Sequence, residues 1–167
     1  MLKAFLERRR LKKTFERYVS PDIGRQLING TLTSPNPAHT ERSIEFAFIA
    51  ISAPEAPSYS ERAGIVANIA FEHGGIVHSL VPVVIVAFGS VHAVPSGACL
   101  PFVTSVQSRL SDAAAIVHGS ATASVGSFGG DRLCDFGFWW PGALDALQKL
   151  ATLSPGQTYE LPIERNA

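Results

Sequence analysis

The chain has 167 residues, a length that suits one domain with a substantial hydrophobic core. It is 46% hydrophobic and 17% charged, and its 14 basic residues balance its 14 acidic ones, which excludes a polyelectrolyte-like or disordered protein. No apolar run approaches the roughly 18 residues of a membrane-spanning helix. Residues 7–10 interrupt the N-terminus with charge where a signal peptide would be apolar, so we expect a cytoplasmic protein.

The charges are unevenly distributed along the chain. Residues 1–17 contain two acidic residues, Glu7 and Glu16, and seven of the 14 basic residues: Lys3, Arg8, Arg9, Arg10, Lys12, Lys13 and Arg17. This segment therefore carries +5, and the rest of the neutral chain carries −5. Such a segment can contact an acidic partner, a membrane surface or nucleic acid, although a solvated helix face is the simpler interpretation.

The first half of the chain predicts a helical lead-in followed by the start of a mixed domain. Good helix formers without Gly or Pro predict a helix over residues 2–17, and Ser20-Pro21 predicts the start of a short helix over 22–28. A run of apolar residues predicts a buried strand over 43–52, and an amphipathic helix follows over 57–73. We therefore divide the chain into a lead-in, residues 1–30, and one domain, residues 31–167.

The second half alternates strands and helices. Two β-branched runs predict a hairpin over 75–89 that reverses near Pro82. The later elements predicted are a helix over 101–110, strands over 113–118 and 121–127 with a break at Gly119-Ser120, a turn at 126–130, a strand over 135–140, a helix over 141–152 and a strand over 158–161. This order predicts an α+β sandwich, with helices covering a mostly antiparallel sheet.

Cysteine and histidine give no metal motif. Cys99 and Cys134 are too few for a disulfide framework or a zinc site, so we expect buried free thiols and no cofactor. His73 follows a predicted helix end, where capping is the simplest role. His78 and His118 could face a pocket, but a structural hydrogen-bonding role is the simpler interpretation for each.

Two phrases carry a family resemblance. The hairpin that runs from Gly74-Gly75 to Phe88-Gly89 resembles the central hairpin of class III nucleotidyl cyclases, the adenylyl and guanylyl cyclases. Residues 15–22, Phe-Glu-Arg-Tyr-Val-Ser-Pro-Asp, resemble the lead-in to many bacterial members. The resemblance extends over about residues 11 to 161 and implies a ferredoxin-like βαββαβ fold of the cyclase type, preceded here by the basic N-terminal helix.

The resemblance also locates the positions at which cyclases carry their chemistry. The two metal-binding aspartates would fall at Ala50 and Pro82, and the two base-reading residues at Ser79 and Gly137. The ribose-orienting Asn and the transition-state Arg would fall at two further positions, Leu144 and Gln148. Shifting the alignment by one residue offers Asp145 and Lys149 instead, which does not restore the Asn and Arg together. Divalent cations need oxygen ligands, which Ala and Pro side chains lack, so the resemblance implies a degenerate member without a metal cofactor.

An aromatic cluster closes this part of the chain: Phe136, Phe138, Trp139 and Trp140. Side chains alternate faces along a strand, so these rings cannot all point inward, and Trp is enriched at interfaces. Cyclase active sites form at a dimer interface. We therefore hypothesise a homodimer, or a heterodimer with a cyclase-like partner.

The sequence favours a catalytically inactive cyclase-homology domain, a pseudoenzyme that acts as a dimerisation or regulatory module in signalling. A nucleotide-binding sensor without turnover is the alternative. An active cyclase with a non-standard site that uses His78 or Asp135 is a third reading, and nucleic-acid binding through residues 8–13 is the weakest.

Overall fold

The computed structural model describes residues 39–90, 94–130 and 133–162, and it describes their side chains except within 127–136. The predicted helices over 2–17 and 22–28, and with them the basic N-terminal segment, lie outside these ranges. The elements in chain order are β1 (Thr40–Ile51), α3 (Ala56–Glu72), β2 (Ile76–Ser79), β3 (Val84–Phe88), α4 (Cys99–Leu110), β4 (Ala114–Gly130), β5 (Leu133–Trp139), α5 (Ala143–Ala151) and β6 (Thr158–Glu160). Within the described part of the chain, no helix is both long enough and apolar enough to cross a bilayer.

One mixed sheet organises these elements. Its strands lie in the order β2-β3-β1-β4-β5, and β6 pairs with β4 beside that path. Every pairing is antiparallel except that of β4 with β6. The structure therefore confirms the predicted α+β architecture with a mostly antiparallel sheet.

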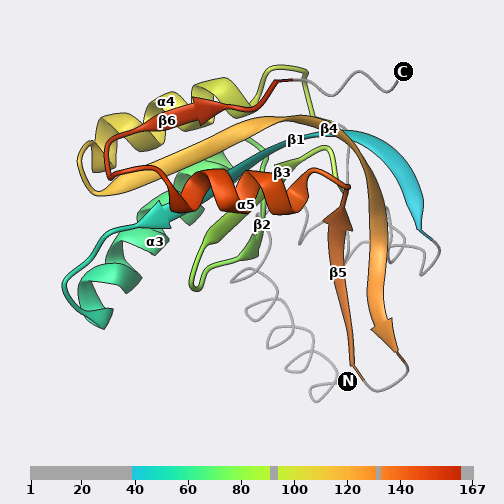
Figure 1. Ribbon diagram of the computed structural model, residues 1–167, viewed down its shortest axis with the longest axis horizontal. Helices are drawn as coiled ribbons and strands as arrows, with labels where there is room; N and C mark the ends of the chain where they lie inside the picture. Colours follow the sequence, from blue (N-terminus) through green and yellow to red (C-terminus); the bar gives the residue numbers. More distant parts are fainter. Residues whose placement is uncertain (1–38, 91–93, 131–132, 163–167) are drawn as a thin grey trace, which may run out of the picture.

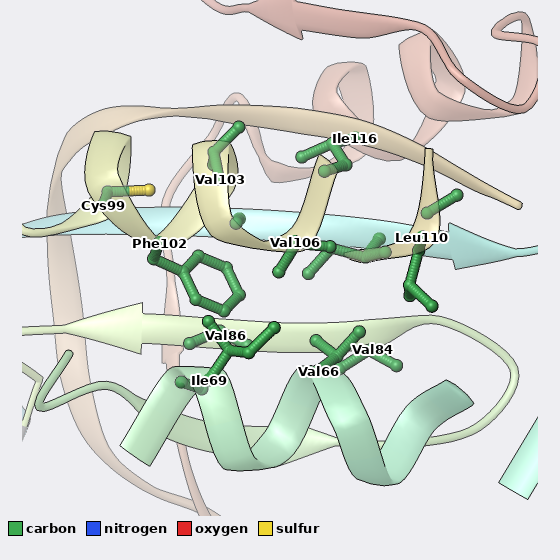
Figure 2. Close-up of a cluster of buried hydrophobic side chains, with 14 of the residues drawn as sticks. Val66, Ile69, Val84, Val86, Cys99, Phe102, Val103, Val106, Leu110 and Ile116 are labelled. Atoms are coloured by element: carbon green, nitrogen blue, oxygen red, sulfur yellow. The ribbon is translucent and has the colours of Figure 1, made fainter. Parts of the chain in front are cut away.

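Helices cover both faces of the sheet (Figure 1). Helices α3 and α4 pack on one face, where the first core joins Val66 and Phe102 to β-strand residues such as Ile49, Val86 and Ile116 (Figure 2). Helix α5 packs on the opposite face and contributes Ala146 and Leu150 to a second core. The alternation of side chains along β1 accounts for this division, because neighbouring residues of a strand point to opposite faces.

The second core is built around aromatic rings. The centroids of the Phe46 and Phe48 rings on β1 lie 4.4 Å and 5.8 Å from that of Trp140, which is only 5% exposed. Val117 and Val125 of β4 complete this layer under α5. Trp140 thus contributes to the core that fastens the C-terminal part of the chain to the sheet.

Strand β4 differs from its prediction. The two short strands expected over 113–118 and 121–127 form one continuous strand, Ala114–Gly130, and residues 126–130 are paired strand rather than a turn. Gly119 does not break the strand, because its missing side chain makes room for its neighbours. A Cβ at this position would lie 3.3 Å from Leu161 and 3.3 Å from the Phe46 ring. The other predicted elements within the described ranges are confirmed to within a few residues at their ends.

Gly75 allows a second close approach, at the start of the hairpin. A Cβ there would lie 2.8 Å from a Phe88 ring atom and 2.9 Å from a Val86 methyl group, whereas Gly64 on α3 has no atom within 4 Å. We expect Gly75→Ala to lower the free energy of unfolding by about 1–3 kcal/mol through overpacking. Gly64→Ala, the control, should raise it by about 0.5–1 kcal/mol, because Ala favours the helix. Urea denaturation measures both, and a neutral Gly75→Ala would contradict this packing.

Candidate functional site

The turn between β2 and β3 is apolar and exposed. The Leu80 and Val81 side chains are 41% and 70% exposed, and Pro82, which follows a cis peptide bond, is also exposed. The Ser79 hydroxyl donates to the Val81 carbonyl oxygen at 3.3 Å, so this side chain closes the turn. The two positions expected to carry a base-reading Lys and a metal-binding Asp therefore belong to a hydrogen-bonded turn with an apolar tip.

Helix α3 holds this turn in place. The Tyr59 hydroxyl lies 2.6 Å from the Leu80 carbonyl oxygen and 3.1 Å from that of Pro82, and it donates to them. Desolvation by burial raises the pKa of Tyr59 above its usual value. One turn further along α3, the Arg62 guanidinium donates to the Ser52 carbonyl oxygen just after β1. The helix thereby positions both chain segments at which a cyclase would bind its metal ions.

Ala50, at the other expected metal-ligand position, lies near the end of β1. It is opposite Ala115 of β4 and packs against the second core. Its methyl group has no ligand atom to offer. Among the described residues, no group of three or more His, Cys, Asp or Glu side chains is arranged to hold a metal ion.

The remaining predicted positions lie on β5 and α5. Gly137 pairs with Gly126 of β4, and on α5 Leu144 is 66% exposed while Gln148 is also exposed. The shifted alignment would place Lys149 at the position of the Arg. The Lys149 ammonium lies 4.3 Å from the centroid of the Tyr159 ring and forms a cation–π contact with it. Neither alignment gives these positions the amide and guanidinium of a cyclase.

The structure nevertheless brings the hairpin and β5 together over the α5 face of the sheet. The His78 ring meets the edge of the Phe138 ring at 4.9 Å between centroids, and its Nε2 lies 3.3 Å from the Ser90 hydroxyl oxygen. The sequence neighbours of these two rings, Ser79 and Gly137, are the two expected base-reading positions. The contact between the His78 and Phe138 rings therefore joins the two chain segments that carry these expected positions.

The aromatic cluster divides between the interior and the surface. Trp140 is buried and stacks on Phe138, with 5.8 Å between centroids and 8° between ring planes. Trp139 is 53% exposed. The side chain of Phe136 lies outside the described set. Of the rings predicted to form an interface, Trp140 is covered by its own chain, and Trp139 offers the largest exposed surface among those described.

Solved structures with the same fold are cyclase catalytic domains. A bacterial light-regulated adenylyl cyclase superposes with a TM-score of 0.68 and 14% identity over 90% of this chain and 50% of its own, so the chain spans about half of that protein. The adenylyl cyclase CyaB from P. aeruginosa gives a TM-score of 0.59 at 17% identity over 73% of this chain and 78% of its own. The guanylate cyclase domain of RhGC from Catenaria anguillulae, solved in complex with GTP, gives a TM-score of 0.61 at 14% identity over 72% of this chain and 79% of its own.

The described residues have the fold of a class III nucleotidyl cyclase catalytic domain. No protein-family model and no curated protein matches the sequence. At these identities the likeness establishes the fold alone, so what this cyclase-like domain does has to be argued from its own side chains.

On the face covered by α4 lies a partly buried polar cluster that the sequence did not reveal. The Glu45 carboxylate accepts hydrogen bonds from the Gly97 and Cys99 amides, at 2.5 Å and 2.8 Å, and so caps the start of α4 from the middle of the sheet. The Cys99 thiol donates to the Phe46 carbonyl oxygen at 3.2 Å. Burial, reinforced by Glu45 and Glu160, raises the pKa of Cys99 to about 12. The prediction of a buried free thiol is confirmed for Cys99.

His118 lies near this cluster, on β4, where it is opposite Ala47 and beside Glu160 of β6. Its side chain is 6% exposed. Burial lowers the pKa of His118, and the Glu160 carboxylate only partly offsets this effect. His118 therefore favours the neutral form in the folded protein.

This burial predicts a dependence of stability on pH. Below its ordinary pKa of about 6.5, the unfolded chain binds a proton at His118 more readily than the folded chain does, so the free energy of unfolding should fall as the pH drops from about 7 to about 5. In His118→Gln this fall should be smaller, whatever the overall stability of the variant. Urea denaturation at several pH values measures it, and equal slopes in the two proteins would contradict the assignment.

Proposed function

We propose that this chain is a catalytically inactive cyclase-homology domain that acts by binding another protein, first of all a second copy of itself or a cyclase-like partner. The observation that carries the proposal is the replacement of both metal-ligand positions by apolar groups. Ala50 packs into the second core, and Pro82 belongs to an exposed apolar turn. A cytoplasmic regulatory role in signalling follows from this proposal as an expectation.

Negative charge develops during cyclisation and has to be stabilised. Phosphoryl transfer depends on positioning and on stabilising that charge, which metal ions and an arginine supply. Losing one such preorganised donor costs about 10²–10³ in rate, and here the metal ligands and the Arg position, Gln148, are replaced together. The fold is kept without the groups that would accelerate the reaction.

Two features support a role in protein contacts. Strand β1 pairs with β4 only as far as Val125, so residues 126–130 of β4 continue beyond it with β5 as a two-stranded ribbon (Figure 1). Such a ribbon is marginally stable alone in water and gains from being packed against another surface. The exposed apolar side chains of Val81 and Leu144 belong to the hairpin and to α5.

We expect no cyclase activity from the purified full-length chain. With ATP or GTP and either Mg²⁺ or Mn²⁺, cyclic nucleotide formation should lie at least about 10⁴-fold below that of an active class III cyclase assayed alongside. Mass spectrometry of the products provides the measurement. Formation of cyclic AMP or cyclic GMP, with or without added metal ions, that is lost in His78→Ala or in Asp135→Asn would overturn the proposal.

Calorimetric titration separates the proposal from the alternative of a nucleotide sensor. An interaction module should give no saturable heat with ATP, GTP or their cyclic products, with or without divalent cations. Saturable binding without turnover would favour the sensor and contradict a function confined to protein contacts.

Leu144 and Leu100 offer a matched pair for testing self-association. Leu144 on α5 is 66% exposed and Leu100 on α4 is 59% exposed, and the two helices cover opposite faces of the sheet. At tens of micromolar we expect the wild-type chain to sediment as a dimer. Leu144→Glu should weaken the dimer about tenfold or more by burying a charge at the contact, and Leu100→Glu should leave it unchanged. A wild-type monomer would refute the homodimer, and equal effects of the two substitutions would place the contact elsewhere.

A further inference from the structure

One edge of β4 has a gap between its two neighbours. On this edge β6 pairs with residues 116–118 and β5 pairs with residues 124–130. The bonds that β4 forms there come from alternate residues, since the Ala114 and His118 carbonyls and the Ile116 amide all bond to residues 156–161. By the same alternation Ser120 and Thr122 direct their main-chain groups to this edge, where no described strand pairs with them.

A pocket of about 460 Å³ occupies the gap. Its polar walls include Glu41 of β1, Ser120 and Thr122 of β4 and Asp145 of α5, and its aromatic walls include Trp139 and Trp140. None of the six positions that correspond to cyclase chemistry lines it. Asp145, which only the shifted alignment would count among those positions, is part of the lining, so the resemblance does not account for the rest of the pocket.

The lining selects for a cation. It includes two carboxylates, Glu41 and Asp145, and no Lys, Arg or His, so it disfavours a phosphate or another anion. The half-exposed Trp139 ring offers a face for a cation–π contact. Carbonyl groups at the unpaired edge of β4 accept hydrogen bonds. A guanidinium group satisfies all three conditions, because it is planar, permanently charged and carries five donors and no acceptor.

We propose that this pocket binds an arginine side chain from the segment Arg8–Arg10 of the same chain. This segment lies within the 17 residues that carry +5, whereas the remainder of the chain carries −5. The first strand begins at Thr40, next to Glu41 in the pocket wall. The residues between Arg10 and Thr40 are therefore the tether that connects the segment to the site. The contact ties the lead-in to the domain beside the start of β1. It does not depend on the proposed absence of catalysis or on a dimer.

Quenching of tryptophan fluorescence by acrylamide in the full-length chain tests the contact, because Trp139 lines the pocket while Trp140 is buried. We expect Arg8→Gln/Arg9→Gln/Arg10→Gln to increase quenching at low salt, since the guanidinium no longer covers the indole. The matched control, Lys3→Gln/Lys12→Gln/Lys13→Gln, removes the same charge from the same segment and should quench like the wild type. Glu41→Gln/Asp145→Asn should increase quenching as the arginine variant does. A variant that combines the arginine and carboxylate substitutions should show no further increase.

Three outcomes would overturn the proposal: no change in the arginine variant, an equal change in the lysine variant, or additive effects of the arginine and carboxylate substitutions. Quenching that varies with protein concentration would also do so, because it would place a second copy over Trp139 instead. The Leu144→Glu variant separates this test from the proposed dimer. In that background, the arginine substitutions should change the quenching by as much as they do in the wild-type chain.

Discussion

The pairing of β1 with β4 is the constraint on which the remaining structure depends. All 12 residues of β1 pair with β4, from Thr40 opposite Val125 to Ile51 opposite Ala114. Because β1 is central and apolar from Phe46 to Ile51, this part must be covered on both faces, and its alternation assigns each side chain to a core. Ala47 and Ile49 point to α3 and α4, while Phe46 and Phe48 point to α5. Every other element either extends this pair of strands or shields one of its faces.

The same constraint accounts for the surroundings of Ala50, one of the positions expected to correspond to a cyclase metal ligand. Ala50 continues the alternation of Phe46 and Phe48, so its side chain packs against the aromatic core under α5. A carboxylate at such a position has to be compensated by a cation, because an uncompensated charge beside apolar groups is costly. A small apolar side chain needs no such compensation. At the hairpin tip, hydrogen bonds from Tyr59 and Ser79 satisfy main-chain carbonyls and hold the turn.

Elements whose signal is local could be predicted from the sequence, and those that depend on distant partners could not. The hairpin over 75–89 and the helices after Pro57 and Pro141 follow from β-branched runs and helix-start signals. Gly119 suggested a break because glycine weakens an isolated strand, but here it admits Phe46 and Leu161, which are remote in sequence. The assignment of six cyclase positions by resemblance stays a prediction. The capping of α4 by Glu45 could not, because it joins residues more than 50 positions apart.

The clustering of charged residues at the pocket beside β4 could likewise not be predicted from the sequence. The imbalance between the basic lead-in and the acidic remainder is visible in the sequence, but the acidic residues are spread along the chain. Only the fold brings Glu41, from the first strand, and Asp145, from the last helix, to one gap in a sheet edge. The two adjacent tryptophans differ in exposure because neighbouring side chains in extended backbone point to opposite sides. Once Trp140 is committed to the core with Phe46, Trp139 is left at the surface, where its ring is available to whatever binds there.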